Sequence, residues 1–86
     1  MRRVDSANLL LEAGRPAAAL RVAPEPLPSG DVSADHAEVL LLLARAHRQA
    51  GNRCEAHDWL ARALRLINTH HLERVRPEAE ALAQQF

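Results

Sequence analysis

The clearest hydrophobic pattern in the chain is a helical one between residues 37 and 66. Side chains of similar character recur there at the spacing i, i+3, i+4 and i+7, which places them on one face of a helix. They form two sets, Leu40, Leu43, Ala44 and His47, followed by Ala56, Leu60, Ala63 and Ile67. The pattern predicts two antiparallel helices joined by a tight turn at Gly51 and Asn52. Small side chains at Ala44 and Ala56 would let the helices approach closely.

A shorter version of this pattern precedes it. Residues 3–13 predict a first helix with an apolar stripe of Val4, Ala7, Leu10 and Leu11. Gly14 ends it and Pro16 starts a second helix over residues 16–22, because Gly suits the left-handed position after a helix and Pro suits a first turn. Gly14 and Gly51 are 37 positions apart, and this offset also aligns Ala7 with Ala44 and Ala19 with Ala56. We interpret it as an internal repeat.

The segment between the repeats is rich in proline. Pro24, Pro26 and Pro28 predict an extended connection over residues 24–30. We interpret it as a stiff linker, with a ligand for a proline-reading domain as the alternative. Ser33 is then expected to cap the third helix, and the unbroken apolar run at residues 39–43 predicts that this helix is contacted from several sides.

The C-terminal part predicts two further helices. Asn52 and Glu55 resemble a capping box at the start of the fourth helix, in which Trp59 is expected to be substantially buried. Residues 69–85 predict a fifth helix that Pro77 either kinks or restarts. Its apolar stripe is Leu72, Val75, Ala79, Leu82 and Phe86.

Composition narrows the fold and the function. Hydrophobic residues make up 48% of the chain, mostly Ala and Leu, and no alternating run of β-branched and aromatic residues occurs, so we predict an all-α fold of about five helices. Eleven basic and eleven acidic residues cancel, which argues against direct nucleic-acid binding by this segment. The single Cys54 cannot form an intramolecular disulfide, and no apolar run is long enough to span a membrane. We therefore expect a cytoplasmic protein.

No constellation for catalysis or metal binding can be assembled. The five histidines are interpreted as solvated or packing residues, since the adjacent His70 and His71 would point about 100° apart on a helix. Cys54 is interpreted as a plain cysteine, although His57 lies three residues away. We predict that the chain is not an enzyme and that it has no cofactor and no metal.

The order Leu40-x2-Leu43-Ala44-x2-His47, then Gly51, Ala56-x3-Leu60 and Ala63, resembles a tetratricopeptide repeat. The sizes agree with that repeat, whereas its Trp, Tyr and Phe are replaced here by Leu40, His47 and Leu60. The resemblance implies a single domain of antiparallel helix hairpins stacked as a short solenoid. Its parts would be repeat 1 at residues 1–23, the linker at 24–30, repeat 2 at 33–67 and a C-terminal helix at 69–86.

The same resemblance implies a function in binding other proteins. In that family the first helix of each pair lines a concave surface that receives a protein or peptide partner. Carried over, the groove residues are Glu38, Leu41, Arg45 and Arg48, joined by Val4 and Asn8. An arginine there would pair with a carboxylate of the partner. A solvated basic edge is the alternative interpretation.

A second resemblance covers residues 43–66 and 71–86. These runs, LARAHRQAGNRCEAHDWLARALRL and HLERVRPEAEALAQQF, are similar to the helical-repeat region of large LuxR-type bacterial transcription activators related to the maltose-regulon activator. This resemblance implies an alternative function as the sensor or oligomerisation segment of a transcription regulator.

A short stack is expected to leave apolar surface at its ends. The predicted patches are Val4 and Leu11 on the first helix, and Val75, Leu82 and Phe86 on the last. Exposed apolar patches usually mark interfaces, and the zero net charge gives little repulsion between copies. We therefore predict a homodimer that associates through the C-terminal helix.

Overall fold

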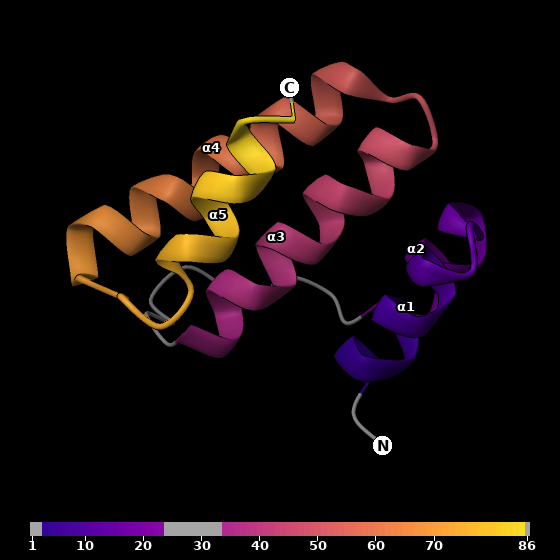
Figure 1. Ribbon diagram of the computed structural model, residues 1–86, viewed down its shortest axis with the longest axis horizontal. Helices are drawn as coiled ribbons and strands as arrows, with labels where there is room; N and C mark the ends of the chain where they lie inside the picture. The colour runs from indigo at the N-terminus through magenta and orange to yellow at the C-terminus, as the bar shows by residue number, and fades with distance from the viewer. Residues whose placement is uncertain (1–2, 24–33, 86) are drawn as a thin grey trace.

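The arrangement of the chain is known from a computed structural model, which describes residues 3–23 and 34–85. Within these ranges the chain forms five helices and no strand (Figure 1). They are α1 (Arg3–Glu12), α2 (Pro16–Val22), α3 (Ala34–Gln49), α4 (Arg53–His70) and α5 (Arg76–Ala83). The all-helical prediction is confirmed. The predicted Ser33 cap and the predicted linker at 24–30 lie outside the described residues. None of the helices described has both the length and the apolarity that crossing a membrane requires.

The turns of the two helix pairs are built alike. Gly14 between α1 and α2 and Gly51 between α3 and α4 both adopt the expected left-handed conformation, with φ of 75° and 89°. The residue after each glycine donates its N–H over 2.8 Å to the carbonyl five positions back, Arg15 to Leu10 and Asn52 to His47. These bonds satisfy carbonyls that a helix end leaves without partners. The two turns therefore close in the same way, at the 37-residue offset seen in the sequence.

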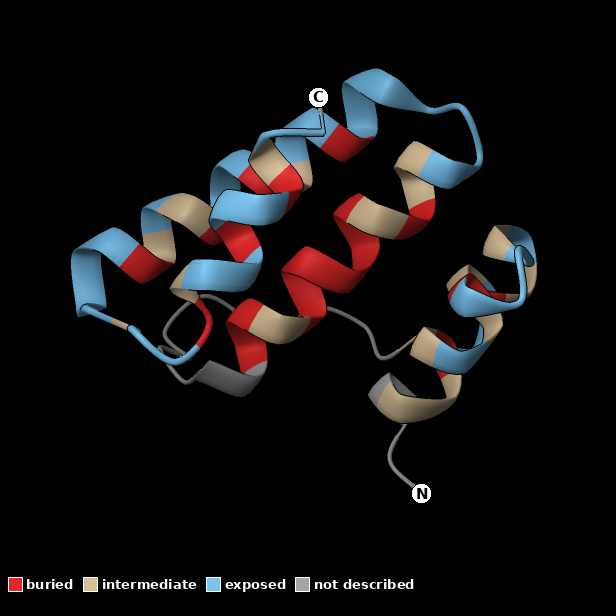
Figure 2. Cartoon of the chain, viewed as in Figure 1, coloured by how far each residue is buried: buried red, intermediate tan, exposed pale blue. Residues whose placement is uncertain are grey.

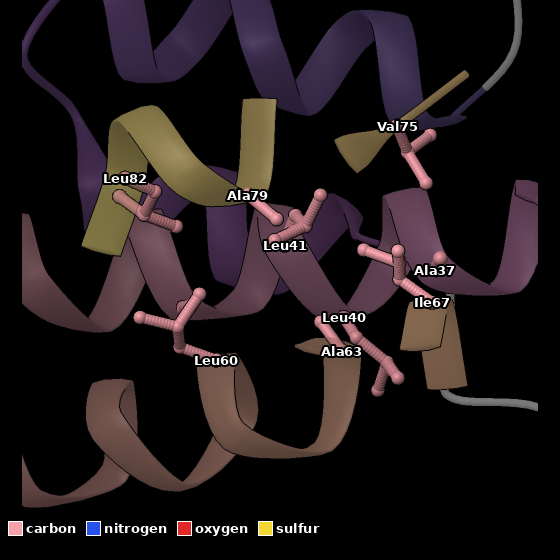
Figure 3. Packing of buried hydrophobic residues seen from close by; sticks show 10 residues of the cluster. Ala37, Leu40, Leu41, Leu60, Ala63, Ile67, Val75, Ala79 and Leu82 are labelled. Atoms are coloured by element: carbon pink, nitrogen blue, oxygen red, sulfur yellow. The ribbon is translucent and has the colours of Figure 1, made fainter. Parts of the chain in front are cut away.

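Helix α3 lies at the centre of the structure and separates two hydrophobic clusters (Figure 2). Residues 39–44 are all buried, which confirms that this helix is contacted from several sides. The smaller cluster joins α3 to α1 and α2 and consists of Ala7, Leu11, Ala19, Leu42 and Ala46. The larger cluster joins α3 to α4 and α5 (Figure 3) and consists of Ala37, Leu40, Leu41, Ala44, Leu60, Ala63, Ile67, Val75, Ala79 and Leu82. Both small residues of the predicted close approach, Ala44 and Ala56, are fully buried.

One local prediction about α4 needs correction. Asn52 precedes the helix but makes no capping hydrogen bond with its side chain. Its Nδ2 and the Oε2 of Glu55 each lie 3.3 Å from Nδ1 of His47, so both side chains turn to the histidine and the predicted capping box is wrong. Trp59 is largely buried, as predicted. It packs against the larger cluster, and the guanidinium of Arg62 lies 4.8 Å from the ring centroid.

The boundary between α4 and α5 also differs from the prediction. Helix α4 runs on to His70 and ends where His71 adopts the left-handed conformation with φ of 55°. Helix α5 begins only at Arg76, with Pro77 in its first turn, so of the two predicted roles of Pro77 the start of a new helix is correct. Arg76 connects α5 to the end of α4 and to the turn between them. It donates to Oδ1 of Asn68 over 2.7 Å and to the carboxylate of Glu73. The hydrogen bond from Arg76 holds the pKa of the Glu73 carboxyl below its usual value.

Candidate partner-binding face

Helices α1, α3 and α5 meet at the side chain of Arg45. Its Nη1 donates to Oδ1 of Asn8 in α1 over 3.1 Å and approaches Oε1 of Glu78 in α5 at 3.4 Å. The Arg45 side chain keeps 29% of its surface exposed, and that of Glu78 keeps 46%. The structure thus brings together Arg45 and Asn8, two residues that the sequence placed on one face, and adds Glu78.

Glu38 and Arg48 lie on α3 on either side of Arg45. Oε1 of Glu38 receives a hydrogen bond from Nη1 of Arg74 over 3.1 Å, and the Glu38 side chain is only 17% exposed. Nη2 of Arg48 donates to the backbone carbonyl of Gln85 over 3.2 Å. Three of the four predicted groove residues therefore contact the segment that follows α4. We call Glu38, Arg45 and Arg48, with Asn8 and Glu78, the Arg45 face.

The fourth predicted groove residue, Leu41, is placed differently. Its side chain is fully buried and points toward Ala79 of α5 within the larger cluster (Figure 3). The prediction that Leu41 lines an open groove is therefore wrong. The physical reason is that α5 has an apolar stripe to bury, and Leu41 is the apolar position on this side of α3.

The apolar patches predicted at the ends of the stack are also different. Leu11, Val75 and Leu82 are 2%, 2% and 4% exposed, because each packs within the core of its own chain. The prediction that Val75 and Leu82 form an exposed self-association surface is wrong for this arrangement. Phe86 and the side chain of Val4 lie outside the described residues. The homodimer itself stays a prediction.

The ion pair between Arg45 and Glu78 is partly exposed to solvent and adds little to the stability of the fold. An exposed ion pair contributes about 0–1 kcal/mol to stability, because water screens it and both side chains lose freedom in forming it. Loss of the contact between Arg45 and Glu78 would therefore cost the fold little. The guanidinium of Arg45 stays partly exposed on this face, and its hydrogen bond to Asn8 orients it.

A pocket that the sequence did not predict lies beside this face. Arg48, Arg53, His57 and Gln85 line a volume of about 390 Å³ where α3 passes into α4. The only sequence signal was the spacing of Arg53 and His57, which puts both on one side of a helix. Gln85 joins them from a different element, and that proximity arises only in the folded chain.

Other side chains with reactive chemistry form no comparable arrangement. Cys54 is exposed on the first turn of α4. Within residues 3–23 and 34–85, no group of three or more His, Cys, Asp or Glu side chains has a geometry suited to a metal ion. Comparisons with protein-family models, with curated proteins and with solved structures find no match for this chain.

Proposed function

We propose that this chain is a protein-interaction module of the tetratricopeptide type, and that its Arg45 face binds an acidic segment of a partner protein or peptide. The observation that carries the proposal is the position of Arg45, where three helices that are distant in sequence converge on one partly exposed cation. A residue at such a junction can contact a partner that lies across all three helices.

The packing order of the helices supports the repeat type. Each of the pairs α1–α2 and α3–α4 is closed by the same turn, and α3 contacts both helices of the preceding pair. Helix α5 in turn contacts α4, and its Ala79 and Leu82 share a cluster with Leu41 of α3. Stacked hairpin repeats predict this order, because each unit buries its apolar face against its neighbour.

The two arginines of this face support an acidic partner, since its two carboxylates, Glu78 and Glu38, are already paired with Arg45 and Arg74. Arg45 and Arg48 lie one helical turn apart on α3, and both remain partly exposed. A guanidinium binds a carboxylate through two parallel hydrogen bonds, which Lys cannot reproduce. Such pairs add to affinity, accelerate association and weaken with salt.

Affinity capture with matched variants tests the proposal. Native lysate is passed over the wild-type chain, over Arg45→Ala with Arg48→Ala, and over Arg21→Ala with Arg65→Ala. The control pair removes the same two charges from exposed positions on α2 and α4. We expect the partner to be lost or weakened at least tenfold with the first pair only, with unchanged helical circular dichroism.

Salt dependence supplies the second readout. Affinity of the captured partner for the wild type should fall as ionic strength rises, and the slope should be shallower for the Arg45→Ala and Arg48→Ala variant. A partner that both pairs of variants retain equally would show that the Arg45 face is not its binding surface.

A further inference from the structure

We propose that the pocket lined by Arg48, Arg53, His57 and Gln85 binds a carboxylate or phosphate group of a small anionic ligand. This site differs from the Arg45 face in the residues that form it and shares only Arg48 with it. The proposal rests on the cavity, on the side chains that line it and on the way that the fold brings them together.

Three elements contribute to the pocket. Arg48 lies in the last turn of α3, Arg53 begins α4, and Gln85 follows α5. The turn at Gly51 holds Arg48 and Arg53 at the same end of the helix pair, through the hydrogen bonds from Gly51 to Arg48 and from Asn52 to His47. His57 follows Arg53 by one turn on the same side of α4. The fold therefore brings these four side chains, which belong to three segments of the chain, to one cavity.

The lining is rich in groups that bind anions. Among the described residues it consists of two guanidinium groups, an imidazole and an amide, with no carboxylate side chain. Arg48 donates one N–H to the backbone carbonyl of Gln85, and this hydrogen bond orients its guanidinium. An arginine has five N–H groups in total, so this bond uses only one of its donors. The planar fork of an arginine matches the geometry of a carboxylate or a phosphate.

The backbone next to the pocket adds to this preference. Helix α4 begins at Arg53, and the side chain of Asn52 does not cap it. The nearest acidic residue of the first turn, Glu55, contacts His47 and does not line the pocket. The positive end of the helix dipole thus reinforces the charges of the lining.

The volume indicates the size of the ligand. About 390 Å³ falls near the lower end of the range of roughly 300–1,000 Å³ that is typical of small-molecule sites. A molecule of metabolite size fits this space. The zero net charge of the chain gives no broad positive field, so the recognition we propose is local.

Titration of the isotope-labelled chain, followed by nuclear magnetic resonance, tests the site. Inorganic phosphate serves as one probe and N-acetylglycine, a single carboxylate, as the other. We expect saturable shifts at Arg48, Arg53 and His57 with one or both probes, and a response to only one of them identifies the group. Arg53→Ala with His57→Ala should weaken the binding at least tenfold. The control Arg62→Ala with His70→Ala, at exposed positions of the same helix, should not.

Separate variants test the anion site and the Arg45 face. Arg53 and His57 are not part of the Arg45 face, so their replacement should weaken anion binding at least tenfold and leave partner capture intact, whereas Arg45→Ala should do the reverse. Shifts that rise linearly without saturating, or equal weakening by both pairs of variants, would overturn the anion site. If Arg53→Ala with His57→Ala alters the circular dichroism, Arg53→Gln with His57→Gln replaces it.

Discussion

A chain carrying Leu41→Ala should lose about 2–5 kcal/mol of unfolding free energy, the usual cost of removing a buried leucine side chain and leaving a cavity. Leu41 is fully buried and belongs to the cluster that α3 forms with α4 and α5. A domain of this length is stable by only about 4–13 kcal/mol, at 0.05–0.15 kcal/mol per residue. The substitution therefore removes a large share of the stability and loosens α5 in particular.

Urea denaturation followed by circular dichroism measures this loss. The matched control is Leu9→Ala, which removes the same atoms from a side chain that is 53% exposed and should change stability by less than about 1 kcal/mol. Equal, small losses for both variants would mean that Leu41 faces solvent, as it would in an open groove, and that α5 does not pack on α3.

Overfilling the close contacts within the helix pairs should have the second largest effect. Ala56→Leu in α4 and Ala19→Leu in α2 should each destabilise the chain by about 1–3 kcal/mol, because the extra carbons have no space and force the helices apart. Both alanines are fully buried, and they occupy equivalent positions 37 residues apart. Similar losses at both positions are expected if the two hairpins are packed alike.

Thermal denaturation decides this point, since each kcal/mol shifts the midpoint by roughly 4–8 °C in a domain of this size. The controls Ala61→Leu and Ala17→Leu add the same carbons at exposed positions of the same two helices and should leave the midpoint almost unchanged. An unchanged midpoint for Ala56→Leu would contradict the close approach of α3 and α4.

The hairpins could be predicted from the sequence because their determinants are local. The apolar spacing of Leu40, Ala44, Leu60 and Ala63 defines the buried faces, and Gly51 supplies the left-handed turn between the helices. Each of these features acts within a few residues along the chain. Local features of this kind determine a helix and its turn before tertiary packing is considered.

The errors arose where contacts between distant segments decide the outcome. The predicted end of the second repeat at residue 67 was too early, because the weak helix propensity of Asn68 and Thr69, a few tenths of a kcal/mol, cannot end α4 while Ile67 is buried in the core. Leu41 was assigned to a groove because the resemblance to a repeat does not specify where the next helix packs. Asn52 and Glu55 both contact His47 and do not cap the helix. The sequence pattern of a capping box does not include a third residue that binds both side chains.

The candidate sites also contain a part that the sequence predicted and a part that depends on contacts between distant segments. Asn8 and Arg45 were placed on one face by the resemblance to a tetratricopeptide repeat, and the structure joins them by a hydrogen bond. Glu78 was not included, because its contact with Arg45 depends on the position of α5. The pocket at Arg53 and His57 needed Gln85 from the end of the described chain, which no sequence spacing relates to them.

The binding of a partner across α1, α3 and α5 is tested most directly by mapping its contacts on the labelled chain. The partner captured from lysate is added to the isotope-labelled wild type, and the nuclear magnetic resonance signals of the backbone and arginine side chains are followed. We predict that the largest changes occur at Asn8, Arg45 and Glu78, which belong to three different helices. Changes confined to the exposed side of α4, at Arg62 and Arg65, with none at Arg45, would contradict the proposed function.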